Sequence, residues 1–220
     1  MISKQNANDI RNDLDFSITK RCHQIKILEF LKTNLPLFTR KLVEVDKDLS
    51  TTYEDDITRE IVNLLNDRLR KEADYIFRFE AKSGPDVLIF ASPYIPFSNV
   101  LFVIEAKRLP PTSSQDYVKT GIGRFKKEEH AKQHNVAVML GYVQEKDFNH
   151  WHGKVNSWII ALISDTSENP RWTKEEKINK IQITDIGEYQ STHCRITEEP
   201  ITLHHFWINL CNHASKIILN

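Results

Sequence analysis

Two short apolar runs that carry charges at their ends limit the fold more than any other feature of this sequence. Residues 87–90 and 101–104 are rich in β-branched and aromatic side chains, and a proline-containing segment separates them, which predicts two neighbouring strands of a buried sheet. Asp86 stands where the first strand begins, and Glu105 and Lys107 stand near the end of the second. Positions two apart on a strand point to one face. Because unpaired charges are costly to bury, we expect a partner for them, such as a divalent cation and a phosphate.

The same residues resemble the metal motif of the PD-(D/E)xK nuclease superfamily, which has the restriction-endonuclease-like fold. The matching letters are Pro85-Asp86 and Glu105-Ala106-Lys107. The resemblance implies that Asp86 and Glu105 bind Mg²⁺, with Mn²⁺ as a substitute, and that the backbone carbonyl of Ala106 is a further ligand. Lys107 would orient the attacking water and stabilise developing negative charge. The alternative is a surface hairpin in which Asp86 caps a turn and the other two charges form an ion pair.

An upstream helix is predicted after two threonines at residues 51–52, which we expect to provide its N-cap. Glu54, Ile57 and Ile61 share one helical face, so Glu54 should point inward at the start of this helix. Nucleases of this superfamily often carry a helical glutamate that helps to position the metal. By that resemblance Glu54 is the first choice and Glu60 the reserve. The alternative is that Glu54 only interacts with the helix dipole.

A second helical pattern covers residues 118–134, after the Glu105–Lys107 segment. Gly121 and Gly123 weaken a helix, so they indicate that something approaches closely at this point. Basic side chains beside glycine suit a phosphate. By analogy with the superfamily, Arg124 and Lys119 would contact the scissile phosphate of a nucleic acid, whereas the neighbouring Lys126 and Lys127 would form a solvated face. Residues 121–125 and 141–143 also resemble restriction-endonuclease-like proteins associated with bacterial defence.

Histidines elsewhere in the chain are interpreted as structural. His130 and His134 lie four apart in the predicted helix, but without an HExxH pattern we take them as surface or core residues. Ser191, His193 and Arg195 alternate on one predicted strand face. That face would bind phosphate or nucleic acid, or it would be the satisfied polar side of an edge strand, and the sequence leaves its role open.

The predicted fold class is α/β, with a restriction-endonuclease-like core in which helices flank a central mixed sheet. Residues 1–50 form an N-terminal helical extension and residues 51–220 the nuclease-like domain. Within the extension, residues 9–34 are helical, Pro36 ends that helix, and residues 37–45 form a second one. The extension packs on the core or mediates dimerisation. The remaining predictions are strands at 75–79, 136–143, 181–186, 189–196 and 201–206, with 136–143 central and parallel to a neighbour, and an amphipathic helix at 148–162.

Composition limits the partners without identifying them. The 220 residues contain 30 basic and 30 acidic side chains, so a nucleic-acid partner would need a local basic surface. Three scattered cysteines predict no disulfide framework and favour the cytoplasm. The sequence shows no signal peptide and no membrane-spanning segment.

These observations lead to three functional hypotheses. The first is a Mg²⁺-dependent endonuclease that hydrolyses phosphodiester bonds of DNA, in bacterial defence or DNA processing. The second is a catalytically inactive nuclease-fold subunit that binds nucleic acid or a protein. The third is an RNA-directed nuclease, because a metal site reads phosphate and not the 2′-hydroxyl. Analogy with the superfamily also suggests a homodimer, and a partner protein would supply targeting.

Overall fold

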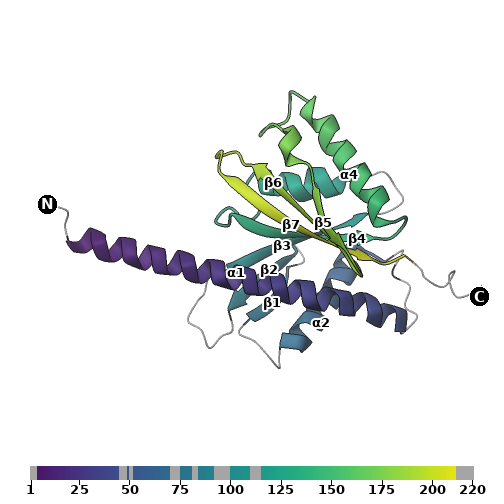
Figure 1. Ribbon diagram of the computed structural model, residues 1–220, viewed down its shortest axis with the longest axis horizontal. Coiled ribbons are helices and arrows are strands. Elements are labelled where there is room, and N and C mark those ends of the chain that lie inside the picture. Colours follow the sequence, from purple (N-terminus) through teal and green to yellow (C-terminus); the bar gives the residue numbers. More distant parts are fainter. Residues whose placement is uncertain are drawn as a thin grey trace, which may run out of the picture.

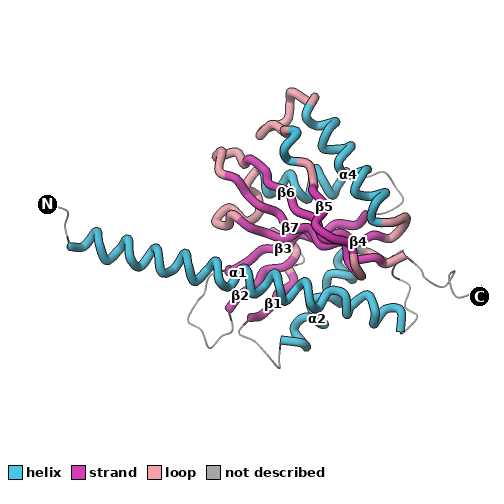
Figure 2. The backbone as a smooth tube through the Cα atoms, in the orientation of Figure 1, coloured by secondary structure: helices cyan, strands magenta, loops and turns pink. Residues whose placement is uncertain are grey.

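The centre of the molecule is a seven-stranded mixed sheet with helices on both faces, so the predicted α/β class with a mixed sheet is confirmed (Figures 1 and 2). The computed structural model describes residues 4–44, 49, 52–69, 75–80, 84–91, 100–109 and 115–211, with side chains of the first helix described from residue 20 to residue 41. The helices are α1 (Lys4–Glu44), α2 (Glu54–Leu69), the π-helical η1 (Tyr117–Ile122), α3 (Gly123–Lys126), α4 (Phe148–Ile163) and the 3₁₀-helical η2 (Lys174–Glu176). The strands are β1 (Tyr75–Phe79), β2 (Val87–Ala91), β3 (Val100–Leu109), β4 (Val136–Val143), β5 (Asn179–Ile183), β6 (Ile186–Cys194) and β7 (Pro200–Asn209).

The sheet has the order β1-β2-β3-β4-β7-β6-β5. β4 is parallel to both β3 and β7, while β1, β2 and β3 form an antiparallel meander at one end and β7, β6 and β5 another at the opposite end. The run at 136–143 is therefore the buried, central, parallel strand that its unbroken hydrophobicity predicts.

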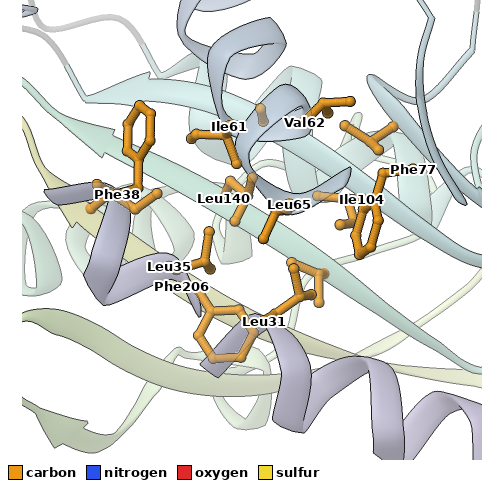
Figure 3. Close-up of a cluster of buried hydrophobic side chains, with 14 of the residues drawn as sticks. Leu31, Leu35, Phe38, Ile61, Val62, Leu65, Phe77, Ile104, Leu140 and Phe206 are labelled. Carbon is orange, nitrogen blue, oxygen red and sulfur yellow. The ribbon is translucent and has the colours of Figure 1, made fainter. Parts of the chain in front are cut away.

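Helical periodicity explains which helix covers which face. In α2 the buried side chains Ile57, Ile61 and Leu65 follow each other at intervals of four. Ile61 and Leu65 pack with Leu35 and Phe38 of α1 on one face of the sheet (Figure 3). On the opposite face, η1, α3 and α4 enclose a second cluster that includes both tryptophans of α4, Trp151 and Trp158. These tryptophans are core residues, as expected.

The prediction that Pro36 ends the first helix was wrong. α1 is one continuous helix of 41 residues with Pro36 inside it. An internal proline costs about 3 kcal/mol because it lacks an N–H group and crowds the preceding turn. Leu31, Leu35 and Phe38 are nevertheless buried on one stripe that packs on the sheet and on α2. Burial on both sides of the proline outweighs that cost, and it fixes this part of α1 on the core, while the N-terminal half runs past the sheet (Figure 1).

The helix predicted over residues 118–134 is also shorter than expected. η1 and α3 together end at Lys126, and the positive φ angles of Glu128 and Ala131 then turn the chain back toward β4. His130 and His134 therefore do not share a helical face.

Smaller boundary errors have local causes. α2 begins at Glu54, so Tyr53 and not Thr52 precedes the first helical residue. The run predicted as a strand at 181–186 is divided by a turn, because Ile186 already belongs to β6. β6 lies between β7 and β5, so it is not the edge strand of the sheet. Within the described residues, no helix has the length and apolarity needed to cross a membrane.

Candidate active site at the open edge of β3

The predicted motif residues lie where β2 and β3 separate. The β2 pairing ends at Ile104, and among the described residues only β4 pairs with the rest of β3. Two carboxylates replace the missing strand: the Ala106 N–H donates to Asp86 Oδ2 (2.7 Å), and the Arg108 N–H donates to Glu54 Oε2 (2.9 Å). The backbone of β3 thus positions both carboxylates, because buried amide groups need acceptors.

The Lys107 ammonium is the meeting point of three acidic side chains. Its Nζ lies 2.8 Å from Glu54 Oε1, 3.0 Å from Glu105 Oε1 and 3.7 Å from Asp86 Oδ2. Nζ also donates to the carbonyl oxygen of Ala106 at 2.6 Å. The structure therefore brings together all the residues predicted from the metal motif and from the helical glutamate. The reserve candidate Glu60 lies half-buried further along α2.

Glu105 is held from the opposite side of the site by two further residues. Its side chain is fully buried, with Arg124 Nη1 2.9 Å from Oε1 and His130 Nδ1 2.9 Å from Oε2. Arg124 was predicted from the sequence, and its side chain remains 38% exposed, so it can also reach a ligand. His130 was missed, because the sequence placed it on a helix and not on the turn that returns to the sheet. We call these six residues the site cluster: Glu54, Asp86, Glu105, Lys107, Arg124 and His130.

Lys119 lies outside the site cluster. It is exposed on η1, and its electrostatic effect falls on Asp165. Gly121 explains how η1 approaches the site: a Cβ there would lie 2.6 Å from Met139 Cε and 3.2 Å from Lys107 Cγ. The close approach predicted for this glycine is confirmed, and its partners are side chains of the sheet. A Cβ at Gly123 would meet only the Val118 carbonyl oxygen, at 3.4 Å.

In the site cluster the carboxylates outnumber the permanent cations. Three carboxylates face two permanent cations, Lys107 and Arg124. Burial, reinforced by the Glu105 charge, raises the pKa of Asp86 to about 6, although Lys107 partly compensates. Burial alone would raise the pKa of Glu105, but His130 and Lys107 lower it. Burial disfavours the Lys107 ammonium, yet the surrounding carboxylates raise its pKa, so this side chain is protonated at neutral pH.

This donor set suits a hard divalent cation. Mg²⁺ prefers carboxylate and carbonyl oxygens, which Asp86, Glu105, Glu54 and Ala106 supply together with the excess negative charge. In the described part of the chain, no three His, Cys, Asp or Glu side chains form a compact, ready-made metal cluster, and the Lys107 ammonium lies among the carboxylates.

The Ser191, His193 and Arg195 face is buried against helices and is not a ligand-binding surface. Ser191 Oγ lies 2.7 Å from both His193 Nε2 and His205 Nε2. Lys126 is 1% exposed and donates to Glu176 Oε1 at 2.6 Å, so the prediction of a solvated Lys126 was wrong. No local sequence pattern predicts this pair, because Glu176 lies fifty residues further along the chain. We define the β6 network as the following buried residues on and around β6: Tyr117, Lys126, Glu176, Ser191, His193, His205 and Trp207.

Arg195, at the end of β6, is satisfied by backbone carbonyl groups. Its guanidinium donates to the carbonyl oxygens of Lys132, His134 and Glu199 at 3.3, 3.1 and 3.0 Å. Of the two roles left open for this face, the structure favours internal pairing, but on a buried inner strand and not on an edge strand, and among the described residues His193 Nδ1 has no hydrogen-bond partner.

Comparisons with known proteins add no relative. The chain matches no protein-family model, no curated protein and no solved structure.

Proposed function

We propose that the chain is a metal-dependent nuclease of the PD-(D/E)xK type that hydrolyses phosphodiester bonds of DNA. The observation that carries this proposal is the convergence of Glu54, Asp86 and Glu105 on the Lys107 ammonium at the open edge of β3. Glu54 is on α2, Asp86 directly precedes β2, and Glu105 and Lys107 are on β3. The fold therefore brings together residues that are distant in the sequence. A simple surface hairpin would not collect a third carboxylate from α2.

The arrangement of the sheet supports the same proposal. In a restriction-endonuclease-like core the motif residues lie on adjacent antiparallel strands of a mixed sheet between helical layers. Here β2 and β3 are antiparallel, β3 and β4 are parallel, and helices cover both faces.

Asp86, Glu105 and the carbonyl of Ala106 would hold Mg²⁺, with Glu54 assisting. When bound, the metal would lower the pKa of an attacking water and offset negative charge on the scissile phosphate. Arg124 donates to one oxygen of Glu105 and is exposed enough to contact the phosphate, while His130 Nδ1 lies 2.9 Å from the other oxygen.

Lys107 has a separate role. Its raised pKa keeps it protonated, so it acts as a hydrogen-bond donor and not as a general base. A fixed ammonium beside the phosphate orients the water and stabilises the charge that develops in the transition state.

The test is metal-dependent cleavage by the purified chain of single-stranded and duplex DNA and RNA in parallel. We expect Lys107→Ala and Asp86→Ala each to reduce the rate by at least about 10²-fold, the scale for removing one preorganised group. Lys119→Ala is the matched control, because that lysine is exposed and lies outside the site cluster.

Undiminished cleavage by either site variant contradicts the proposal. Metal-dependent cleavage restricted to RNA would change the substrate to RNA and keep the site. Absence of cleavage on all four substrates, with nucleic-acid binding retained, would favour the inactive subunit.

A further inference from the structure

One aromatic side chain beside the site cluster is exposed in an unusual way. Tyr53 directly precedes Glu54, and its side chain is 72% exposed. Among the described residues it is the most exposed large hydrophobic side chain, and all the others with high exposure are isoleucines. A single exposed hydrophobic residue is ordinary on a protein surface, but the surroundings of this ring are not.

A cation covers Tyr53 and connects it to the site. The guanidinium carbon of Arg108 lies 5.7 Å from the centroid of the Tyr53 ring, within the range of a cation–π contact. The backbone N–H of Arg108 donates to Glu54 Oε2 at 2.9 Å. Glu54 therefore has Tyr53 next to it along the chain and the Arg108 backbone next to it on β3.

The two faces of the sheet each provide a cation to the open edge of β3. Side chains alternate along a strand, so Arg108 points to the face opposite Lys107. Ala106, which shares the direction of Arg108, packs in the cluster under α1 and α2, whereas Arg124 approaches from η1 and α3. A phosphate at the edge would lie between these cations, and the Tyr53 ring would lie to the α2 side of it.

We propose that Tyr53 and Arg108 form a stacking subsite for an unpaired nucleobase next to the scissile phosphate. This inference rests on the proposed nuclease function and specifies its substrate. Within a duplex, neighbouring bases cover both faces of each base, so only a base in a single strand, a flap, a frayed end or a flipped nucleotide can stack on a protein ring. Aromatic rings and arginine are the groups that proteins use to bind unpaired bases without regard to sequence.

The experiment measures binding of labelled oligonucleotides with an uncleavable backbone by fluorescence anisotropy, with Mg²⁺ present. The probes are single-stranded DNA, single-stranded RNA and a closed-end duplex without free ends. The variants are Tyr53→Ala, Tyr53→Leu and Tyr53→Phe, with Ile160→Ala on α4 as the control for loss of an exposed hydrophobic side chain. Because Tyr53 is exposed, these substitutions should leave the melting temperature nearly unchanged.

We expect the wild type to prefer single strands over the closed duplex. Tyr53→Ala and Tyr53→Leu should bind single strands about 5- to 150-fold more weakly, the range for loss of one base–aromatic stack, while Tyr53→Phe retains wild-type affinity. A scan with one abasic nucleotide should find a position whose base matters to the wild type and not to Tyr53→Ala. The affinities of the wild type for single-stranded DNA and for single-stranded RNA show whether the subsite prefers one of the two.

The inference is overturned if Tyr53→Ala binds single strands within twofold of the wild type, or if the wild type binds the closed duplex equally well. In either result the proposed nuclease function survives, because cleavage depends on the site cluster. A wild type that binds none of the probes overturns both.

Discussion

The site cluster and the β6 network contain the same types of charged residue and differ in how their charges are balanced. Each pairs a buried glutamate with a lysine and a histidine: Glu105 with Lys107 and His130, and Glu176 with Lys126 and His193. In the β6 network one carboxylate meets one ammonium. In the site cluster three carboxylates share Lys107, at the edge of β3 that has no strand partner beyond Ile104 among the described residues.

Hydrogen bonding in the β6 network is nearly complete. Lys126 also donates to the carbonyl oxygens of Arg171 and Cys194 and lies 4.7 Å from the Trp172 ring centroid. Glu176 accepts from the Cys194 N–H at 2.8 Å. A buried ion pair with this many partners maintains a structure.

A single orientation of protons satisfies the remainder of the network except His193 Nδ1, which lies 3.8 Å from Glu176 Oε2 and has no hydrogen-bond partner among the described residues. The Trp207 indole donates to the Tyr117 hydroxyl, which can donate to His205 Nδ1, and His205 Nε2 can then donate to Ser191. Ser191 in turn donates to His193 Nε2. Burial lowers the pKa of both histidines, which agrees with this neutral arrangement. The two clusters therefore differ not in residue types but in how many carboxylates share one ammonium, and only the site cluster lies at a backbone edge that is unpaired among the described residues.

Breaking the β6 network should have the largest effect on stability. Glu176→Gln leaves Lys126 as a buried, unpaired cation, and removal of one partner from a buried pair costs about 3–5 kcal/mol. Urea unfolding measures this loss. Glu175→Gln is the matched control because Glu175 is exposed on the same turn, and equal stability of the two variants would refute the structural role of Glu176.

Two glycine-to-alanine variants distinguish the effect of close packing on stability from the effect of helix propensity. Gly121→Ala places a Cβ against Met139 and the Lys107 stem, and such overpacking costs about 1–3 kcal/mol. Gly123→Ala meets ordinary contacts and should gain up to about 1 kcal/mol from helix propensity. Thermal unfolding of both variants tests the difference, and a Gly121→Ala protein that is as stable as Gly123→Ala would exclude a tight contact at Lys107.

The pH dependence of the free energy of unfolding should include a contribution from His134, which lies beside Arg195, the residue after β6. Burial, with Lys20 and Arg195, lowers the pKa of His134 from 6.5 to about 4. Between these values the unfolded chain binds more protons than the native one, so this contribution is complete above pH 6.5 and is lost as pH falls toward 4. The loss reaches about 2 kcal/mol at pH 5.

His134→Gln removes this titration. The stability difference between the wild type and His134→Gln should therefore change by about 2 kcal/mol between pH 7 and pH 5 in urea unfolding. A difference that stays constant over this pH range would mean that His134 takes up its proton as readily in the native state as in the unfolded chain.

The smallest expected effect has the opposite sign to that of Glu176→Gln. Asp86→Asn removes one of the three negative charges around Lys107 while leaving an oxygen to accept from the Ala106 N–H. We expect the metal-free variant to be about 1 kcal/mol more stable than the wild type at pH 7. Urea unfolding in the presence of a chelator measures the change, and a loss of stability would show that the site cluster is balanced in the same way as the β6 network.

The sequence predicted the parts of the site that depend on local pattern. Asp86, Glu105 and Lys107 stand at the ends of strands whose hydrophobicity is unmistakable, and Glu54 follows from the face of an amphipathic helix. His130 could not be predicted, because it reaches Glu105 only after positive φ angles turn the chain. Pro36 stays helical because Leu35 before it and Phe38 after it are buried in the core formed with a sheet of later residues. Tertiary contacts of this kind leave no local pattern in the sequence.

The most direct test of the central claim is a calorimetric titration of Mg²⁺, and then Mn²⁺, into the wild type, Asp86→Asn and the control Glu175→Gln. The excess carboxylate charge of the site cluster predicts micromolar-to-millimolar binding by the wild type and the control, and none by Asp86→Asn. Repeating the titration with an uncleavable oligonucleotide present tests whether phosphate oxygens are needed to complete the metal site. Equal binding by Asp86→Asn, or no binding by the wild type even with the oligonucleotide present, would contradict a metal site at the open edge of β3.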